Sequence, residues 1–213
     1  MIKLTRSAIP IELTDALVEK LTNEFKRKGT SVWNKPFIKE KLLAFSYDKC
    51  CYCECYIQEE SKYMEVEHFK PKHLFPDLVL DWLNLLPSCK RCNGRKGGKT
   101  INIIDPTVID PREHLSLKGF RLRPKTELGQ ATIDVVDLND RNRLVRKRAE
   151  IGQKISTDLE VILIMLNEYS SSPQTERLSK AIYRRIRALL IVSQPYKEYC
   201  ATAATSLLKD SNC

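Results

Sequence analysis

Two pairs of cysteines, each with two residues between its members, constrain the fold of this chain more than any other feature. Cys50 and Cys53 form the first pair, and Cys89 and Cys92 form the second. Each such turn directs two sulfur atoms at one point, and two turns complete the tetrahedral all-sulfur site that zinc prefers in closed structural positions. The spacing therefore predicts a structural zinc ion that staples the middle of the chain.

The first cysteine cluster leaves one alternative open. Cys51 and Cys55 have three residues between them, a spacing that zinc also tolerates. We favour Cys50 and Cys53 as ligands because their spacing matches that of the second pair. Disulfides are not expected, because the N-terminus lacks the continuous apolar segment of a secretion signal and cytosolic thiols stay reduced.

The charge balance of the chain indicates a polyanionic partner. Lysine and arginine number 36 against 27 aspartates and glutamates, which gives a formal net charge of +9. A basic excess of this kind favours nucleic acids through the release of their counterions. The apolar runs of the chain are far shorter than the roughly 20 residues that cross a membrane. We therefore expect a cytoplasmic protein without membrane association.

Helical periodicity flanks a central segment of mixed character. Apolar residues recur at helical spacing over residues 13–27, and Pro36 suits the first turn of a second helix that ends near Phe45. Residues 140–168 are predicted to form one long helix, and residues 106–135 an irregular segment with short strands. Further helices are expected from Pro173 and after Pro195, and a β-like stretch over residues 63–67.

These patterns predict an α+β fold in three parts. Residues 1–47 are predicted to form an N-terminal helical segment, and residues 48–106 a small central module stapled by zinc. Residues 107–213 form a mostly helical C-terminal region whose apolar stripes fit a helical core, with some surplus for docking a partner.

The segment between the two cysteine pairs carries the residues most suited to catalysis. Glu67 and His68 are followed by Asn84, and Asn93 comes directly after the last paired cysteine. Histidine can take a proton from water near neutral pH, because its reference pKa is about 6.5. Carboxylate and amide oxygens suit a magnesium or manganese ion. Activated water and a hard metal ion are what phosphodiester hydrolysis requires.

This order of residues resembles the HNH endonuclease superfamily. A closer likeness is to the HNH subunit of Septu-type antiphage defence systems and to related nucleases found beside some retrons. The stretches that carry it are CYCE (51–54), VEHFKPK (66–72), DWLNLLPSCKRCN (81–93) and IDP (104–106). The likeness covers residues 33–106 well and residues 132–148 loosely.

The resemblance implies a ββα-metal fold, the HNH module, and an activity that cuts DNA, with RNA left open as a second substrate. It implies that His68 is the general base and that Glu67 and Asn93 hold a catalytic magnesium or manganese ion. It also implies that Asn84 ties its loop to the backbone of His68. The partner that it implies is an ABC-type ATPase, with this chain as the effector nuclease of a defence complex.

Two positions depart from the commoner pattern of the superfamily. Glu67 stands where aspartate is commoner, and Asn93 stands where many members have histidine. Asparagine still offers a carbonyl oxygen to a hard metal ion, so the pattern is an HNN variant. Because side chains alternate along a strand, Glu67 and His68 point to opposite faces of an ideal strand. We expect a bend or the strand end near Pro71 to bring both to one site.

A run of basic residues without an acid covers residues 90–99, on the predicted helical element that carries Asn93. Phosphates are drawn to such a surface, and its glycines let the backbone of a nucleic acid approach closely. We predict that this run binds the substrate backbone without reading its sequence. Its members are Lys90, Arg91, Arg95, Lys96 and Lys99.

Two other functions stay open on the sequence alone. The first is a zinc-ribbon module that binds nucleic acid with a degenerate catalytic site, and the second is a structural adaptor of the ATPase. The presence of His68, Asn84 and Asn93 together is evidence against a degenerate catalytic site. Metal-dependent nicking of plasmid by the purified chain would exclude the second.

Overall fold

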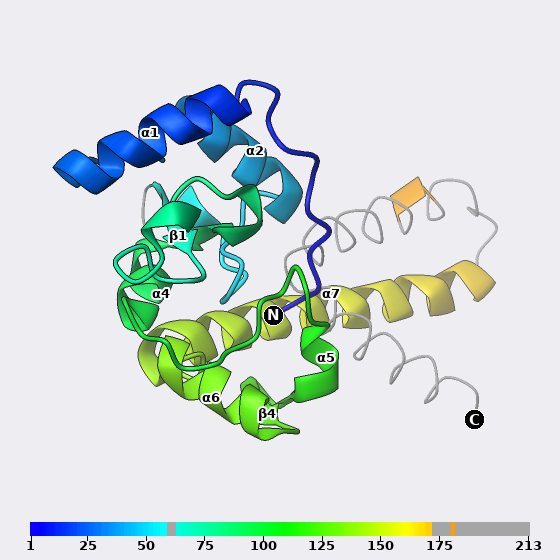
Figure 1. Cartoon of the computed structure of the whole chain (residues 1–213). Helices are drawn as coiled ribbons and strands as arrows, with labels where there is room; N and C mark the ends of the chain where they lie inside the picture. The colour runs from blue at the N-terminus through cyan, green and yellow to red at the C-terminus, as the bar shows by residue number, and fades with distance from the viewer. Residues whose placement is uncertain (59–62, 172–179, 182–213) are drawn as a thin grey trace. The chain divides into compact units, whose positions relative to one another are not determined.

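The computed structural model describes residues 1–58, 63–171 and 180–181 (Figure 1). Contacts divide the chain into a first unit of Met1–Ser116 with Leu122–Asn139, and a second unit of Leu117–Arg121 with the chain from Asp140 onward. The helices expected from Pro173 and after Pro195 lie outside the described residues. Helices and two small two-stranded sheets make up the described part, so the predicted α+β class is confirmed.

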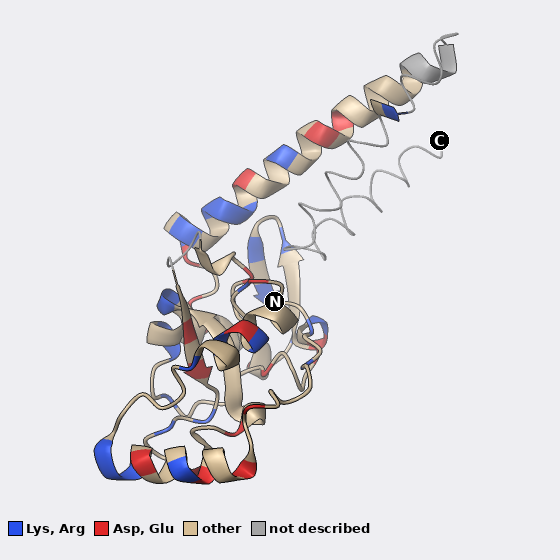
Figure 2. Ribbon diagram, turned by 90° about the horizontal axis from the view of Figure 1, so that it is seen from above, with Lys and Arg blue, Asp and Glu red and all other residues tan. Residues whose placement is uncertain are grey.

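The two predicted N-terminal helices are confirmed as α1, Asp15–Lys28, and α2, Pro36–Ser46. Helix α1 begins at Thr14, whose side chain accepts a hydrogen bond from the Leu17 amide, and ends at Gly29 with a left-handed φ of 67°. Figure 2 shows basic and acidic positions, in blue and red, along the ribbon of α1. Helix α2 instead turns a buried apolar face towards the first unit's core.

A β-hairpin followed by a short helix forms the centre of the first unit. Strands β1, Met64–His68, and β2, Leu85–Cys89, pair antiparallel, with Met64 opposite Cys89 and His68 opposite Leu85. Helix α4, Lys90–Lys96, begins directly after β2 and contacts both strands. The loop between the strands contains two short 3-10 turns, η1 (Pro76–Leu78) and η2 (Trp82–Asn84).

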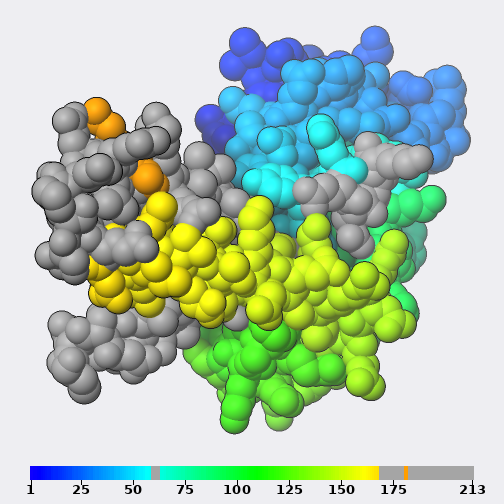
Figure 3. Space-filling view, turned by 180° about the vertical axis from the view of Figure 1, so that it is seen from behind, coloured from blue at the N-terminus to red at the C-terminus, as the bar shows by residue number. Residues whose placement is uncertain are grey.

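The core of the first unit lies where α2 packs on β2. Ile38 and Leu42 of α2 and Leu85 and Leu86 of β2 are completely buried, and Tyr52 from the cysteine-rich turn joins them. Figure 3 shows α1 and α2 in blue beside the cyan segment that leads into β1. The hairpin that carries the catalytic candidates is therefore supported from the N-terminal side by helices that the zinc staple does not include.

Residues 106–135 are more regular than the sequence predicts. The elements are α5 (Pro111–His114), β3 (Leu115–Lys118), β4 (Arg121–Pro124) and α6 (Glu127–Val136). The irregular assignment was wrong for α6, which its glycine and β-branched residues disguise. Gly129 lets α6 approach the chain closely, because a Cβ there would lie 2.1 Å from the His114 carbonyl oxygen. The hydroxyl of Thr132 accepts a hydrogen bond from the Ile104 amide and donates one to the Leu128 carbonyl.

The second unit contains the predicted long helix. Helix α7, Arg146–Ser171, follows a π-helical turn, η3, at Arg141–Val145. The prediction of one α-helix from residue 140 is thus correct except for its first turn. Asp140 accepts backbone hydrogen bonds from Asn142 and Arg143 there and starts the turn. None of the helices among the described residues combines the length and apolarity that a membrane crossing needs.

Candidate active site and metal centre

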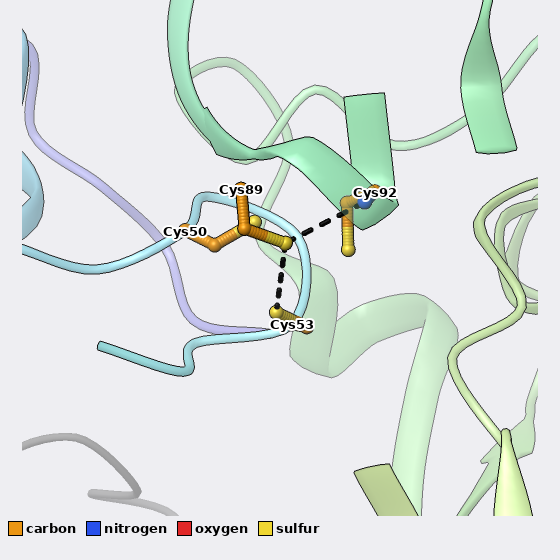
Figure 4. Close-up of side chains that lie close together, drawn as sticks. All are labelled: Cys50, Cys53, Cys89 and Cys92. Atoms are coloured by element: carbon orange, nitrogen blue, oxygen red, sulfur yellow. Dashed lines mark hydrogen bonds between the residues drawn. The ribbon is translucent and has the colours of Figure 1, made fainter. Parts of the chain in front are cut away.

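The four cysteines selected by spacing come together in one buried group (Figure 4). The sulfur atoms of Cys50, Cys53, Cys89 and Cys92 all lie within 4.8 Å of one another. Cys51 and Cys55 are buried nearby but are not members of this group. None of the six cysteines in the described part of the chain is joined in a disulfide.

Local backbone structure brings each pair of sulfurs together. In the first turn, the Cys50 amide donates to the Cys55 carbonyl, and Glu54 adopts a left-handed φ of 62° that reverses the chain. In the second turn, Cys89 caps the N-terminus of α4, and its sulfur accepts a hydrogen bond from the Cys92 amide at 3.5 Å. One pair thus lies on a tight turn and the other on a strand–helix junction.

The geometry of this group fits a zinc ion. Tetrahedral coordination at a Zn–S distance of about 2.3 Å places neighbouring sulfurs about 3.8 Å apart. The sulfurs of Cys53 and Cys89 lie 3.9 Å apart. Burial excludes competing ligands, since all four cysteines are at most 3% exposed. The group therefore has the ligand set and spacing of a closed structural site rather than of one with an open coordination position.

His68 lies at the end of β1 with its ring enclosed. Its Nε2 lies 3.0 Å from the Val79 carbonyl oxygen, and because a carbonyl can only accept, Nε2 carries the proton and Nδ1 keeps the lone pair. The Trp33 and His68 rings pack in a T-shaped, edge-to-face arrangement, with centroids 4.7 Å apart. Burial lowers the pKa of His68 to about 4, assisted by the nearby charges of Lys72 and Lys96. The imidazole is therefore neutral at pH 7, the state that a general base requires.

Asn84 holds the loop beside His68 in a different way from the one expected. Its Oδ1 accepts a hydrogen bond from the Lys70 amide at 2.7 Å, and its Nδ2 donates to the carbonyls of Lys70 and Leu78. The side chain thus ties the loop to the backbone of Lys70, two residues beyond His68. Leu78 directly precedes Val79, whose carbonyl holds the His68 ring, so Asn84 acts on the imidazole through this loop.

Glu67 and Lys96 form a buried ion pair. The Lys96 Nζ lies 2.5 Å from a Glu67 carboxylate oxygen and donates to the His68 carbonyl at 2.8 Å. Burial raises the pKa of Glu67 to about 7, and the attraction of Lys96 opposes this rise. Only 2% of Lys96 is exposed. Lys96 therefore lies inside the site, and its predicted place on the substrate-binding surface was wrong.

Asn93 contacts Glu65 instead of Glu67. Its Nδ2 donates to the Glu65 carboxylate at 2.6 Å, which leaves the Asn93 Oδ1 for another partner. Glu65 and Glu67 both contact side chains of α4, while His68 contacts Val79 and Trp33. Strand β1 stays paired with β2 through His68 and ends there, and the chain bends at Phe69 and Lys70, so the strand end and bend expected near Pro71 are present.

The remaining basic residues of the 90–99 run divide into two groups. Arg91 is largely buried and donates to the carbonyl and carboxylate of Asp137. Lys90, Arg95 and Lys99 are exposed, although Arg95 also pairs with Asp137 at 3.3 Å. The structure thus offers three of the five basic side chains to solvent and uses Arg91 and Lys96 in packing.

Sequence reasoning missed two residues that the site contains. Trp33 has no motif that marks it, and only its position over His68 reveals it. Glu65 precedes the motif by two positions, so strand alternation could have placed it on the same face as Glu67. Among the described residues, the four cysteines are the one group of three or more His, Cys, Asp or Glu side chains close enough to share an ion.

Comparison with known proteins identifies relatives over the whole chain. The family model for HNH endonucleases matches residues 50–99. The chain is 45% identical to a Septu protein PtuB from Bacillus thuringiensis, covering 100% of this chain and 84% of that protein. It is 27% identical to a Septu protein PtuB from Bacillus mycoides, covering 85% and 80%. It is also 27% identical to a candidate HNH endonuclease of retron Vc95 from Vibrio cholerae, covering 73% and 84%.

Proposed function

The chain belongs to the Septu PtuB family of HNH endonucleases, and from this premise we propose that it hydrolyses DNA with His68 as the general base. Nuclease activity and a role in antiphage defence follow from the family. The choice of DNA, the roles of individual residues and the partner are parts of the proposal.

The observation that carries the proposal is the state of His68. A neutral imidazole with its proton held on Nε2 by Val79 has a lone pair on Nδ1 that can take a proton from water. The hydrogen bonds of Asn84 fix the loop that supplies this carbonyl. Transfer of the proton from water to Nδ1 would generate the nucleophile for the phosphorus atom.

The residues that would hold a catalytic magnesium or manganese ion are Glu67 and Asn93, and Glu65 joins them by its contact with Asn93. Their oxygen donors fit such an ion, which typically takes one or two carboxylates and keeps several waters. When bound, the ion would stabilise negative charge on the phosphate and on the leaving oxygen. Glu67 would have to exchange its contact with Lys96, so this pair sets the cost of ion binding.

We assign the four-cysteine group to a structural zinc ion. Its ligands come from the turn at residues 50–53 and from the junction of β2 and α4, so the ion would tie this turn to the end of β2 and to the helix. The exposed side chains of Lys90, Arg95 and Lys99 on and after α4 are suited to the substrate backbone. The same phosphate chemistry would admit RNA.

We also propose a partner, an ABC-type ATPase, on the basis of the similarity to Septu proteins. Such a partner would regulate a nuclease that must not cut the host's own DNA. One arrangement in the structure is consistent with restraint: His68 is 5% exposed beneath Trp33, and Glu67 is occupied by Lys96. The same arrangement favours the alternative function, a binding module with a degenerate site.

Plasmid cleavage by the purified chain tests the proposal. Wild type, His68→Ala and the matched control His114→Ala are compared with magnesium, with manganese and without an added divalent ion, alone and with the ATPase. We expect metal-dependent cutting by wild type and His114→Ala, and its loss in His68→Ala. Binding without cutting by all three proteins, even with the ATPase, would favour the degenerate module. Zinc content should be about one ion per chain.

A further inference from the structure

We propose that a cavity beside the catalytic hairpin receives one unstacked nucleobase of the substrate strand, next to the phosphodiester that is cut. This inference rests on the proposed function, since it names a subsite for the same nucleic acid. The cavity has a volume of about 200 Å³ and lies between residues 69–75, which follow β1, and residues 99–103, which follow α4.

The apolar walls of the cavity are open to solvent. Phe75 is 41% exposed and Ile101 is 54% exposed, while Ile103, at 2% exposure, forms the buried floor of the cavity. Aromatic rings beside aliphatic side chains provide the flat, sequence-tolerant surface on which nucleobases stack in single-strand binding proteins.

The polar lining of the cavity matches a nucleotide. Lys70 and Lys99 line it together with Thr100 and Asn102, and none of its lining residues is acidic. Two exposed cations suit the phosphates on either side of a base, and hydroxyl and amide groups suit its edge. The Lys70 ammonium lies over the Phe75 ring, 5.9 Å from its centroid, so a cation already accompanies the aromatic face.

Shared residues join the cavity to the catalytic centre. Lys96 lines the cavity while its Nζ donates to the His68 carbonyl and pairs with Glu67. Phe69, the residue after His68, lines the cavity as well. A nucleobase in the cavity would therefore contact Phe69 and Lys96, which are directly joined to His68 by the chain and by a hydrogen bond. The occupant that fits all of these features is a base from the strand being cut, not an independent ligand.

Binding of two matched oligonucleotides tests this inference. The first is a short single strand with bases, and the second has the same backbone with abasic sites throughout. Anisotropy is measured without added divalent ions, so that no cutting occurs. Stacking of one base corresponds to a roughly 5- to 150-fold preference of wild type for the first oligonucleotide.

Four variants separate the subsite from general attraction to phosphate. Phe75→Ala and Ile101→Ala should each reduce the preference for bases, whereas Ile11→Ala, at an equally apolar residue that is 89% exposed, should keep it. Lys99→Gln should weaken the binding of both oligonucleotides by the same factor. It should also reduce the slope of log binding constant against log salt concentration by about 0.7. Zinc content and melting temperature confirm that each variant is folded.

An equal affinity of wild type for both oligonucleotides would overturn the inference. So would a preference for bases that survives in both Phe75→Ala and Ile101→Ala, or a failure to bind either oligonucleotide. Plasmid cleavage by the same preparations distinguishes the two levels of the proposal. Metal-dependent cutting without a preference for bases leaves the nuclease in place and removes the subsite, whereas absence of cutting with the ATPase present counts against the nuclease itself.

Discussion

The buried pair of Lys96 and Glu67 makes a prediction about stability. Lys96→Met removes the ammonium from two buried acceptors, the Glu67 carboxylate and the His68 carbonyl. Breaking a buried ion pair by removing one partner costs about 3–5 kcal/mol, because the other charge is left without compensation. For a chain of this size, that loss corresponds to a fall in melting temperature of about 6–20 °C. Lys99→Met, at an exposed lysine, should have little effect.

The pH dependence of the stability loss in Lys96→Met shows whether the uncompensated Glu67 carboxylate causes it. The pKa of Glu67 is raised from 4.5 to about 7 even with Lys96 in place, and loss of the ammonium raises it further. A carboxyl with a raised pKa binds more protons in the folded state than in the unfolded state, so stability falls as pH rises through this window. Lys96→Met should therefore lose more stability at pH 8 than at pH 6.

Urea denaturation of the zinc-loaded protein at both pH values measures the effect. The double variant Glu67→Leu/Lys96→Met should recover most of the lost stability, because a buried pair replaced by apolar residues of similar size is often neutral. A Lys96→Met variant that is as stable as wild type at pH 8, or that loses equal stability at both pH values, would refute the buried pair.

The remaining predictions concern the zinc site, the cover of His68 and the loop clamp. Cys89→Ser should lose zinc and unfold the first unit, because the binding energy of a structural zinc ion is folding energy; unchanged melting after verified zinc loss would contradict this. Trp33→Ala should raise the pKa of His68 from about 4 towards 6.5, because burial is what lowers it, and histidine NMR titration measures the shift. Asn84→Ala removes partly buried hydrogen bonds to the backbone of Lys70 and Leu78 and should cost about 1 kcal/mol per hydrogen bond in denaturation, whereas the exposed Asn102→Ala should cost little.

The sequence predicted the elements whose signals are local. A proline at the first turn and a glycine after the last turn located α2 and the end of α1. The two cysteine turns selected four ligands that the structure does bring together. Each of these features is determined by residues within a few positions of each other, so periodicity and spacing in the sequence are enough to predict it.

The contacts that sequence could not predict are tertiary ones. The burial of Lys96 depends on how α4 packs against β1. From the sequence alone, a lysine within a basic run is predicted to be exposed. Helix α6 was missed because its β-branched residues favour a strand until Thr132 finds buried partners and Gly129 allows close packing. Trp33 reaches His68 only because the segment between α1 and α2 folds over the hairpin.

The central claim is that His68 acts as the general base, and chemical rescue tests it most directly. Single-turnover cleavage of plasmid with magnesium is measured for wild type and His68→Ala, with and without added imidazole. The account predicts a loss of about 100- to 10,000-fold in His68→Ala, partly restored by imidazole, with zinc content unchanged. Equal rates of metal-dependent cleavage by wild type and His68→Ala would contradict it.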